Sequence, residues 1–224
     1  MKTCRNLLAV AALSAISLSS LEAQTLAKWT FETSIPTTAG PLNPEIGAGS
    51  ALGFHAGVAT YSNPAGNGSA ESFSANSWAV GDYFQFSLST AGYAGIGLSF
   101  DQTSSNTGPR DYDLQYSTDG INFTAFVSYQ VLANGASPNA SWNGTTYQSA
   151  YTFNYDLSAI TAIDNAANVY FRLANTSTVA ANGGVVAAAG ANRVDNFTVS
   201  VVPEPASATL LGLGFAALLI RRRN

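Results

Sequence analysis

Hydrophobic and polar side chains alternate along several short segments between residues 24 and 202, and this two-residue period predicts β-strands. The clearest segment is 83–89, where Phe84, Phe86 and Leu88 share one face. The same alternation recurs in residues 26–32, 96–100, 112–116, 123–127, 151–155, 169–173 and 193–201.

The segments between these strands indicate how the strands connect. Residues 117–120, Ser-Thr-Asp-Gly, predict a tight hairpin, because glycine takes the left-handed conformation that closes such a turn. Apolar residues at roughly helical spacing predict one helical turn within residues 157–167. About ten short strands without long helices predict an all-β fold, a single β-sandwich of the jelly-roll type over residues 24–202.

The start of the chain has the three parts of a secretory signal peptide. Lys2 and Arg5 supply positive charge, and residues 7–18 form an apolar run. We expect cleavage after Ala23, because twelve apolar residues are fewer than the roughly 20 that a membrane span requires. Cys4, the one cysteine, lies within this segment, so the mature protein is predicted to contain no disulfide.

The end of the chain combines three features within residues 203–224. Pro203-Glu204-Pro205 is followed by fifteen uncharged, mostly apolar residues at 206–220, and the basic cluster Arg221, Arg222 and Arg223 comes next. The apolar stretch predicts a short transmembrane helix of about 22 Å. The positive-inside rule puts the arginines in the cytoplasm and the preceding domain outside.

These three features, in this order, resemble the PEP-CTERM sorting domain of Gram-negative bacteria. The resemblance implies processing by an exosortase, a membrane protease that recognises the Pro-Glu-Pro motif. The chain is then expected at the inner membrane before processing and at the cell surface or outside the cell afterwards. The alternative is an ordinary single-span anchor with a chance Pro-Glu-Pro sequence.

The composition of residues 24–202 narrows the choice of partners. Four basic residues stand against eleven carboxylates, a net charge of about −7. Nucleic acid is therefore excluded as an expected partner, because phosphate binding requires clustered Lys and Arg. The surface is predicted to be rich in uncharged polar groups, which suits a protein among polysaccharides.

Several internal segments also resemble ectodomains of PEP-CTERM proteins, which are similar in turn to carbohydrate-binding-module-like jelly rolls. These segments are residues 78–84, 104–110, 114–120 and 193–197. The resemblance implies the sandwich fold and brings no assigned reaction. It also implies a structural calcium between the first and last strands, held by Glu32 and Asp195. Asp195 shares a predicted strand face with Phe197, so its burial would require a metal or another partner, which could be Lys28, Arg193 or backbone amides.

Catalytic chemistry has little support in the sequence, and no catalytic residue is predicted. His55 is the one histidine and follows no nucleophile motif, so a Ser/His/Asp or Cys/His arrangement is disfavoured. A glycosidase needs only two carboxylates, and Asp111 and Asp113 are the nearest to a paired motif. Solvated charges at a strand edge explain that pair better.

Sugar binding requires exposed aromatic rings beside hydrogen-bonding side chains. The predicted residues are Trp142, Tyr147, Asn106, Arg110 and Asn143. Trp142 is favoured because Ser-Trp-Asn-Gly is typical of a loop, whereas Trp78 precedes an apolar strand and is expected in the core.

The leading hypothesis is a non-enzymatic surface or matrix protein that binds or assembles with extracellular polysaccharide. A hydrolase using two carboxylates and a purely structural matrix component are the alternatives.

Overall fold

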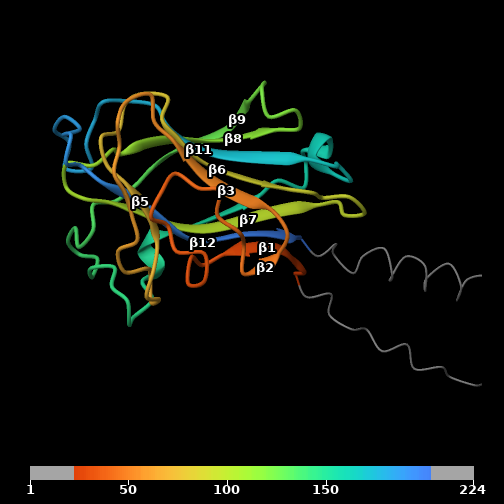
Figure 1. The fold of residues 1–224 in the computed structure, drawn as a ribbon, viewed down its shortest axis with the longest axis horizontal. Helices are drawn as coiled ribbons and strands as arrows, with labels where there is room; N and C mark the ends of the chain where they lie inside the picture. The colour runs from red at the N-terminus through yellow and green to blue at the C-terminus, as the bar shows by residue number, and fades with distance from the viewer. Residues whose placement is uncertain (1–22, 203–224) are drawn as a thin grey trace, which may run out of the picture.

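A computed structural model describes residues 23–202, which fold into two antiparallel β-sheets packed face to face (Figure 1). The prediction of an all-β sandwich is confirmed. The predicted signal peptide at 1–23, the Pro-Glu-Pro motif, the transmembrane segment at 206–220 and the arginine cluster fall outside the described residues, apart from residue 23. Within residues 23–202 no helix is long and apolar enough to cross a membrane.

The first sheet has seven strands, and its main order is β10-β7-β12-β1-β2, with β5 also pairing with β12 and β4 pairing with β5. Its strands are β1 (Thr25–Trp29), β2 (Ile46–Gly47), β4 (Tyr61–Ser62), β5 (Phe73–Ala75), β7 (Ile96–Ser104), β10 (Thr152–Asp156) and β12 (Asn192–Val201). The last strand in sequence, β12, is therefore central to the sheet.

The second sheet has five strands in the order β3-β6-β11-β8-β9. They are β3 (Ser50–Phe54), β6 (Tyr83–Leu88), β8 (Asp111–Ser117), β9 (Thr124–Gln130) and β11 (Val169–Asn175). In β6 and β11, alternate residues point into the sandwich and toward solvent, so this sheet has an inner face and an outer face.

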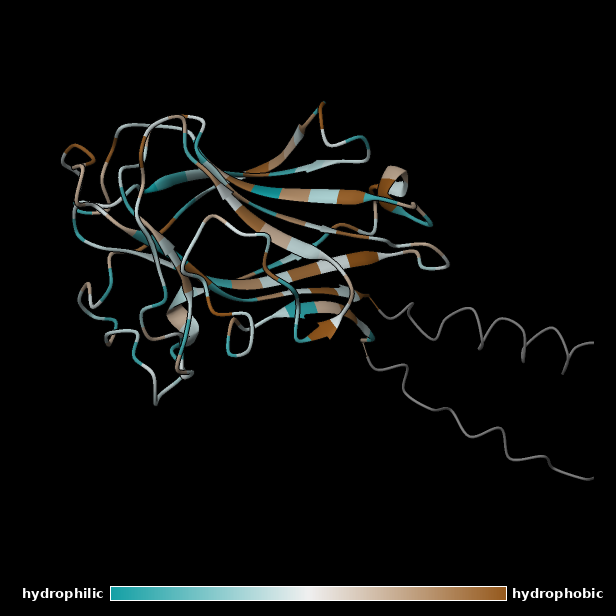
Figure 2. Cartoon of the chain, viewed as in Figure 1, coloured by the Kyte–Doolittle hydropathy of each residue, from teal (hydrophilic) through white to brown (hydrophobic). Residues whose placement is uncertain are grey.

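Aromatic side chains from both sheets fill the space between them. Phe86 of β6 stacks on Phe197 of β12 with ring centres 3.6 Å apart, and Trp29 of β1 meets both rings edge-on. Figure 2 shows the corresponding hydrophobic bands along the strands. Trp78 is 6% exposed, as expected for a core residue. Burial of such large rings is the main stabilising contribution in a domain that lacks cysteine after residue 23.

Two local features differ from the sequence-based expectation. The helical turn predicted at 157–167 is reduced to a 3₁₀ helix at Thr161–Ile163, and a second one occurs at Ser149–Tyr151. The short strands β2 to β5 were not predicted, because most of them contain too few residues to show a period.

The two ends of the described domain lie side by side. The amide of Val201 donates to the carbonyl of Gln24 at 2.9 Å, and the amide of Val202 donates to that of Gly95 at 2.6 Å. The first and last residues of the described domain therefore lie at the same end of the sandwich, on the right in Figure 1.

Candidate functional site

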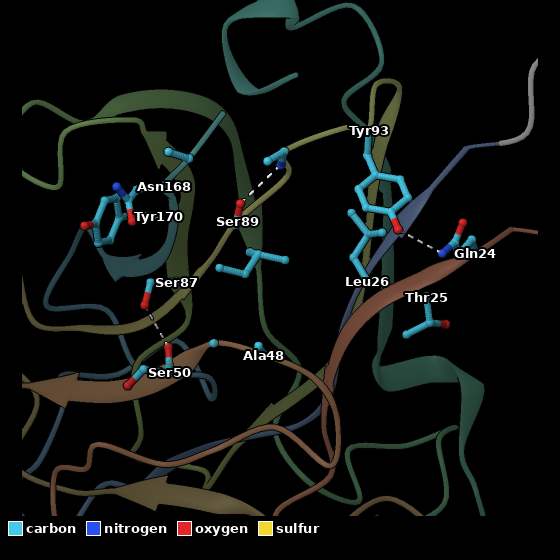
Figure 3. Close-up of a pocket in the computed structure, with 14 residues that line it drawn as sticks. Gln24, Thr25, Leu26, Ala48, Ser50, Ser87, Ser89, Tyr93, Asn168 and Tyr170 are labelled. Atoms are coloured by element: carbon cyan, nitrogen blue, oxygen red, sulfur yellow. Dashed lines mark hydrogen bonds between the residues drawn. The ribbon is translucent and has the colours of Figure 1, made fainter. Parts of the chain in front are cut away.

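A cavity of about 600 Å³ opens at the end of the sandwich where the chain enters and leaves (Figure 3). We call it the tail-end cavity. Five separate stretches of chain line it: residues 24–26, residues 48–50, five residues between Ser87 and Tyr93, residues 167–168, and Tyr170. Its volume lies within the range of roughly 300–1,000 Å³ that is usual for small-ligand pockets.

The lining of the tail-end cavity mixes polar groups with the apolar side chains of Leu26, Leu88 and three alanines, and it contains no acid, lysine, arginine or histidine. Gln24 donates from its side-chain amide to the Tyr93 hydroxyl at 3.2 Å, and the Ser87 hydroxyl donates to the Ser50 carbonyl at 3.2 Å. Asn168 and Tyr170 stand on the opposite side of the opening from Tyr93 in Figure 3. Amides, hydroxyls and two phenol rings therefore surround the space.

Gly49 allows the close packing behind this cavity. A Cβ atom at this position would lie 2.4 Å from the Ser87 carbonyl oxygen and 2.9 Å from the Trp29 ring. Because a backbone atom cannot move aside cheaply, only glycine fits where the chain crosses from β2 to β3.

A second, smaller hollow of about 400 Å³ lies on the outer face of the seven-stranded sheet. We call it the sheet-face groove, and Lys28, Asp101, Tyr147, Thr152 and Asn196 are among its lining residues. Tyr147 is 53% exposed at its rim and shares a hydrogen bond with the Thr152 hydroxyl. This groove, unlike the tail-end cavity, contains charged groups.

Two carboxylates are buried at the sheet-face groove. Burial raises the pKa of Asp195 to about 6, and it also raises the pKa of Asp101. Asp101 lines the groove, whereas Asp195 lies beneath Asn67 and Ser69 and does not. The Asp195 carboxylate accepts hydrogen bonds from the Asn67 backbone amide at 2.9 Å and from the Ser69 hydroxyl at 2.7 Å.

The predicted calcium ligands are satisfied by protein donors. The Glu32 carboxylate accepts the Glu71 amide at 2.9 Å, and the Asp195 carboxylate accepts four protein hydrogen bonds. Within residues 23–202 no group of three or more His, Cys, Asp or Glu side chains is placed to hold an ion. Calcium binding by Glu32 and Asp195 therefore stays a prediction.

The expectation that Trp142 presents an exposed ring is wrong. Its side chain is 3% exposed and packs near Tyr151, with the Arg193 guanidinium 5.3 Å from its ring centre. Trp142 lies in the long connection between β9 and the 3₁₀ helix at Ser149–Tyr151. This connection packs against the domain, so the Trp142 ring is buried although it lies in a loop. Its Nε1 atom is buried without a hydrogen-bond partner.

The other predicted sugar-binding residues are not gathered at one site. Tyr147 lines the sheet-face groove, whereas Arg110 lines a different hollow and pairs with Asp111 at 2.8 Å. Asn143 shapes its own turn, accepting the amides of residues 145 and 146, and Asn106 is exposed in the turn after β7. None of these four residues, and not Trp142 either, lines the tail-end cavity.

The side chains weighed for catalysis, His55, Asp111 and Asp113, are each held by other side chains of the domain. The His55 side chain is 1% exposed, and its Nδ1 atom lies 3.0 Å from the Tyr61 hydroxyl. Burial lowers the pKa of His55, which keeps it neutral in the folded domain. Asp111 is held by Arg110 and Ser177, and Asp113 accepts the Ser128 hydroxyl at 2.6 Å.

The end of the chain matches a known family. A profile of the PEP-CTERM protein-sorting motif matches residues 201–223. The chain thus carries this motif at its C-terminus, as its Pro-Glu-Pro sequence and arginine cluster predict, and the motif implies export and sorting by an exosortase. No curated protein matches the chain.

Several solved structures are similar in fold. One is the K3 cleaved adhesin domain of Lys-gingipain from Porphyromonas gingivalis, at 20% identity and a TM-score of 0.39, covering 63% of this chain and 79% of that one. Another is the CBM22-2 xylan-binding domain of Paenibacillus barcinonensis Xyn10C, at 10% identity and a TM-score of 0.41, covering 79% and 99%. A third, the CBM22-1-GH10 modules of Clostridium thermocellum xylanase 10B, has 11% identity and a TM-score of 0.47, covering 82% and 30%. At these values the similarity concerns the sandwich alone.

Proposed function

We propose that this protein is a non-enzymatic, exosortase-sorted surface protein whose ectodomain binds an extracellular polysaccharide, with one uncharged part of the glycan seated in the tail-end cavity. The PEP-CTERM motif supports the surface location. The cavity supports the binding activity.

The observation that carries the proposal is the uncharged, hydroxyl- and amide-rich lining of the tail-end cavity. A sugar ring offers hydroxyl groups at its rim and C–H groups on its faces. Gln24, Ser50 and Asn168 supply donors and acceptors for the rim, and Tyr93 and Tyr170 supply ring surfaces for the faces. A charged ligand would find no counter-ion within this lining, so the cavity favours a neutral sugar unit.

The buried carboxylates make the hydrolase alternative less well supported. A glycosidase needs two carboxyl groups that face the substrate from both sides, roughly 5–10 Å apart. Asp101 lines the sheet-face groove, but Asp195 is fully buried under Asn67 and Ser69 and does not. A substrate in that groove would therefore meet one carboxylate rather than two.

Affinity electrophoresis through gels containing neutral polysaccharides tests the proposal. The protein should be retarded by at least one polymer, and Tyr93→Ala should reduce the retardation about tenfold or more, as loss of a ring contact worth about 1.5 kcal/mol implies. Tyr147→Ala, which removes an exposed tyrosine from the other hollow, is the matched control and should bind like the wild type. Equal loss in both variants, or no retardation by any polymer, would contradict the assignment. Release of reducing sugars would support the hydrolase instead.

A further inference from the structure

Arg172 of β11 is clamped between two aromatic rings on the outer face of the five-stranded sheet. Its guanidinium carbon lies 3.8 Å from the ring centre of Tyr83 and 3.5 Å from that of Phe123. Its Nε atom donates to the Gln85 side-chain oxygen at 2.8 Å. Such stacking suits the flat guanidinium and limits its rotation.

The charge of Arg172 is not neutralised within the part of the chain that the structure describes. Among residues 23–202 the ion pair between charged side chains is Arg110–Asp111, and Arg172 does not belong to it. Burial lowers the pKa of Arg172, but an arginine side chain stays protonated at neutral pH. The Tyr83 side chain is a second, neutral hydrogen-bond partner of the guanidinium, but no carboxylate of the described domain pairs with it, so its positive charge is left for an anionic ligand.

The other basic side chains of the domain are differently placed. Arg110 is paired with Asp111, and Arg193 is largely buried, where it donates to the Ala65 carbonyl at 3.0 Å. Lys28 lines the sheet-face groove on the other sheet. Arg172 is therefore the cation that the outer face of the five-stranded sheet offers.

Arg172 is also next to the tail-end cavity. Tyr170 precedes it by two residues on the same face of β11 and lines the cavity, and Ser87, which pairs with Tyr170, lines it from β6. Gln85, the hydrogen-bond partner of Arg172, is the next outward residue of β6. At about 3.3 Å per residue, Arg172 lies about 7 Å along the strand from the cavity wall.

We propose that the bound polysaccharide carries uronic acid units, and that Arg172 holds one such carboxylate beside the sugar in the tail-end cavity. This inference rests on the proposed function and names the ligand class. A carboxylate is flat, and its two oxygens match the two parallel N–H groups of a guanidinium fork. The net charge of about −7 on residues 24–202 repels polymers that carry many anionic groups close together. A single fixed arginine therefore favours a polysaccharide whose carboxylates are far apart along the chain.

The test compares two forms of one polymer. Full-length protein in detergent is run through native gels that contain a soluble glucuronate-bearing heteropolysaccharide such as xanthan, or the same polymer after its carboxyl groups have been reduced to alcohols. The wild type should be retarded about tenfold more strongly by the uronate form, the effect of one charge-assisted hydrogen-bonded pair. Equal retardation by both forms would overturn the proposal without any variant. Stronger retardation by a sulfated polymer would overturn the uronate assignment.

Variants locate the effect at Arg172. Arg172→Lys keeps the charge but loses the fork, and Arg172→Gln loses both, so each should abolish the preference for the uronate form. Arg110→Gln removes one positive charge just before β8 of the same sheet and is the matched control, with the preference unchanged. Thermal melts check that the Arg172 variants are folded. The Arg172 variants should still bind the reduced polymer, whereas Tyr93→Ala should lose binding to both forms of the polymer. If the wild type also fails to bind the reduced polymer, the proposed function itself is contradicted. Retention of the preference in Arg172→Gln would contradict the role of Arg172.

Discussion

Asp101 and Asp195 are directly opposite each other on the paired strands β7 and β12, and the Asn196 side-chain amide donates to both carboxylates, at 2.9 and 3.1 Å. Both side chains are buried, and neither forms an ion pair within residues 23–202. Two like charges are thus held close together away from water, which favours the protonated acid.

This pair should make the stability of the domain depend on pH. The pKa of Asp195 rises from 3.8 to about 6 on folding, mainly because of burial and partly because of Asp101. Between these values the folded protein binds more protons than the unfolded chain. The contribution of Asp195 is therefore fully present below about pH 4, and about 3 kcal/mol of it is lost as the pH rises through 6.

Urea unfolding of the wild type and Asp195→Asn at several pH values measures this contribution. The comparison is needed because His55, whose pKa is lowered by burial, changes stability in the opposite direction as it becomes protonated. The free-energy difference between the two proteins should change by about 3 kcal/mol between pH 4 and 7. A difference that is constant over this range would show that Asp195 stays ionised in the folded domain.

Trp142→Ala should destabilise the domain by about 3–5 kcal/mol, the usual cost of removing a large buried ring. The side chain is 3% exposed and covers the Arg193 guanidinium. Tyr147→Ala, at a tyrosine that is 53% exposed, should change the free energy of unfolding by no more than about 0.5 kcal/mol. Urea unfolding distinguishes the two. A stable Trp142→Ala protein would mean that the loop around this ring is open in solution.

Replacement of Pro203, Glu204 and Pro205 by alanines should leave export intact and block processing of the tail. Residues 201–223 match the sorting motif, and the motif implies recognition by an exosortase. Immunoblots of membrane and medium fractions from the native host should show the longer form accumulating in the membrane. Normal processing of this variant would contradict sorting through the Pro-Glu-Pro sequence.

A reporter fused after Asn224 should be active in the cytoplasm and inactive in the periplasm, because Arg221, Arg222 and Arg223 follow the apolar stretch at 206–220. Paired alkaline phosphatase and fluorescent protein fusions measure the two sides. Replacing the three arginines by glutamines should weaken this orientation. Phosphatase activity in the unaltered fusion would reverse the predicted topology.

The strands with a clear two-residue period were predicted well from the sequence. The predicted segment 83–89 corresponds to β6 (Tyr83–Leu88), because one of its faces is buried and the other partly wet. β2 (Ile46–Gly47) could not be predicted in this way, since a two-residue strand has no period and exists only because Ala27 and Lys28 of β1 pair with it.

The binding surfaces were harder to predict, for a different reason. Trp142 lies in a segment with a loop composition, but composition does not reveal that the segment folds back and covers the ring. The tail-end cavity joins Gln24, Gly49, Tyr93 and Asn168, which are far apart in sequence and share no motif. Gly49 allows a close backbone approach behind the cavity, but nothing in the local sequence separates it from the other glycines that do the same.

The central place of β12 has a consequence for how the domain is made. Its residues Asn192–Val201 hydrogen-bond to β1, β5 and β7, yet they are the last of the domain to emerge during N-to-C-terminal export. Until they arrive, those three strands lack their common neighbour, and the sheet cannot close. The sorting motif begins at residue 201, the last residue of β12, so the strand that completes the sheet runs directly into the motif. The segment that completes the sheet and the segment that carries the sorting motif are therefore continuous in the chain.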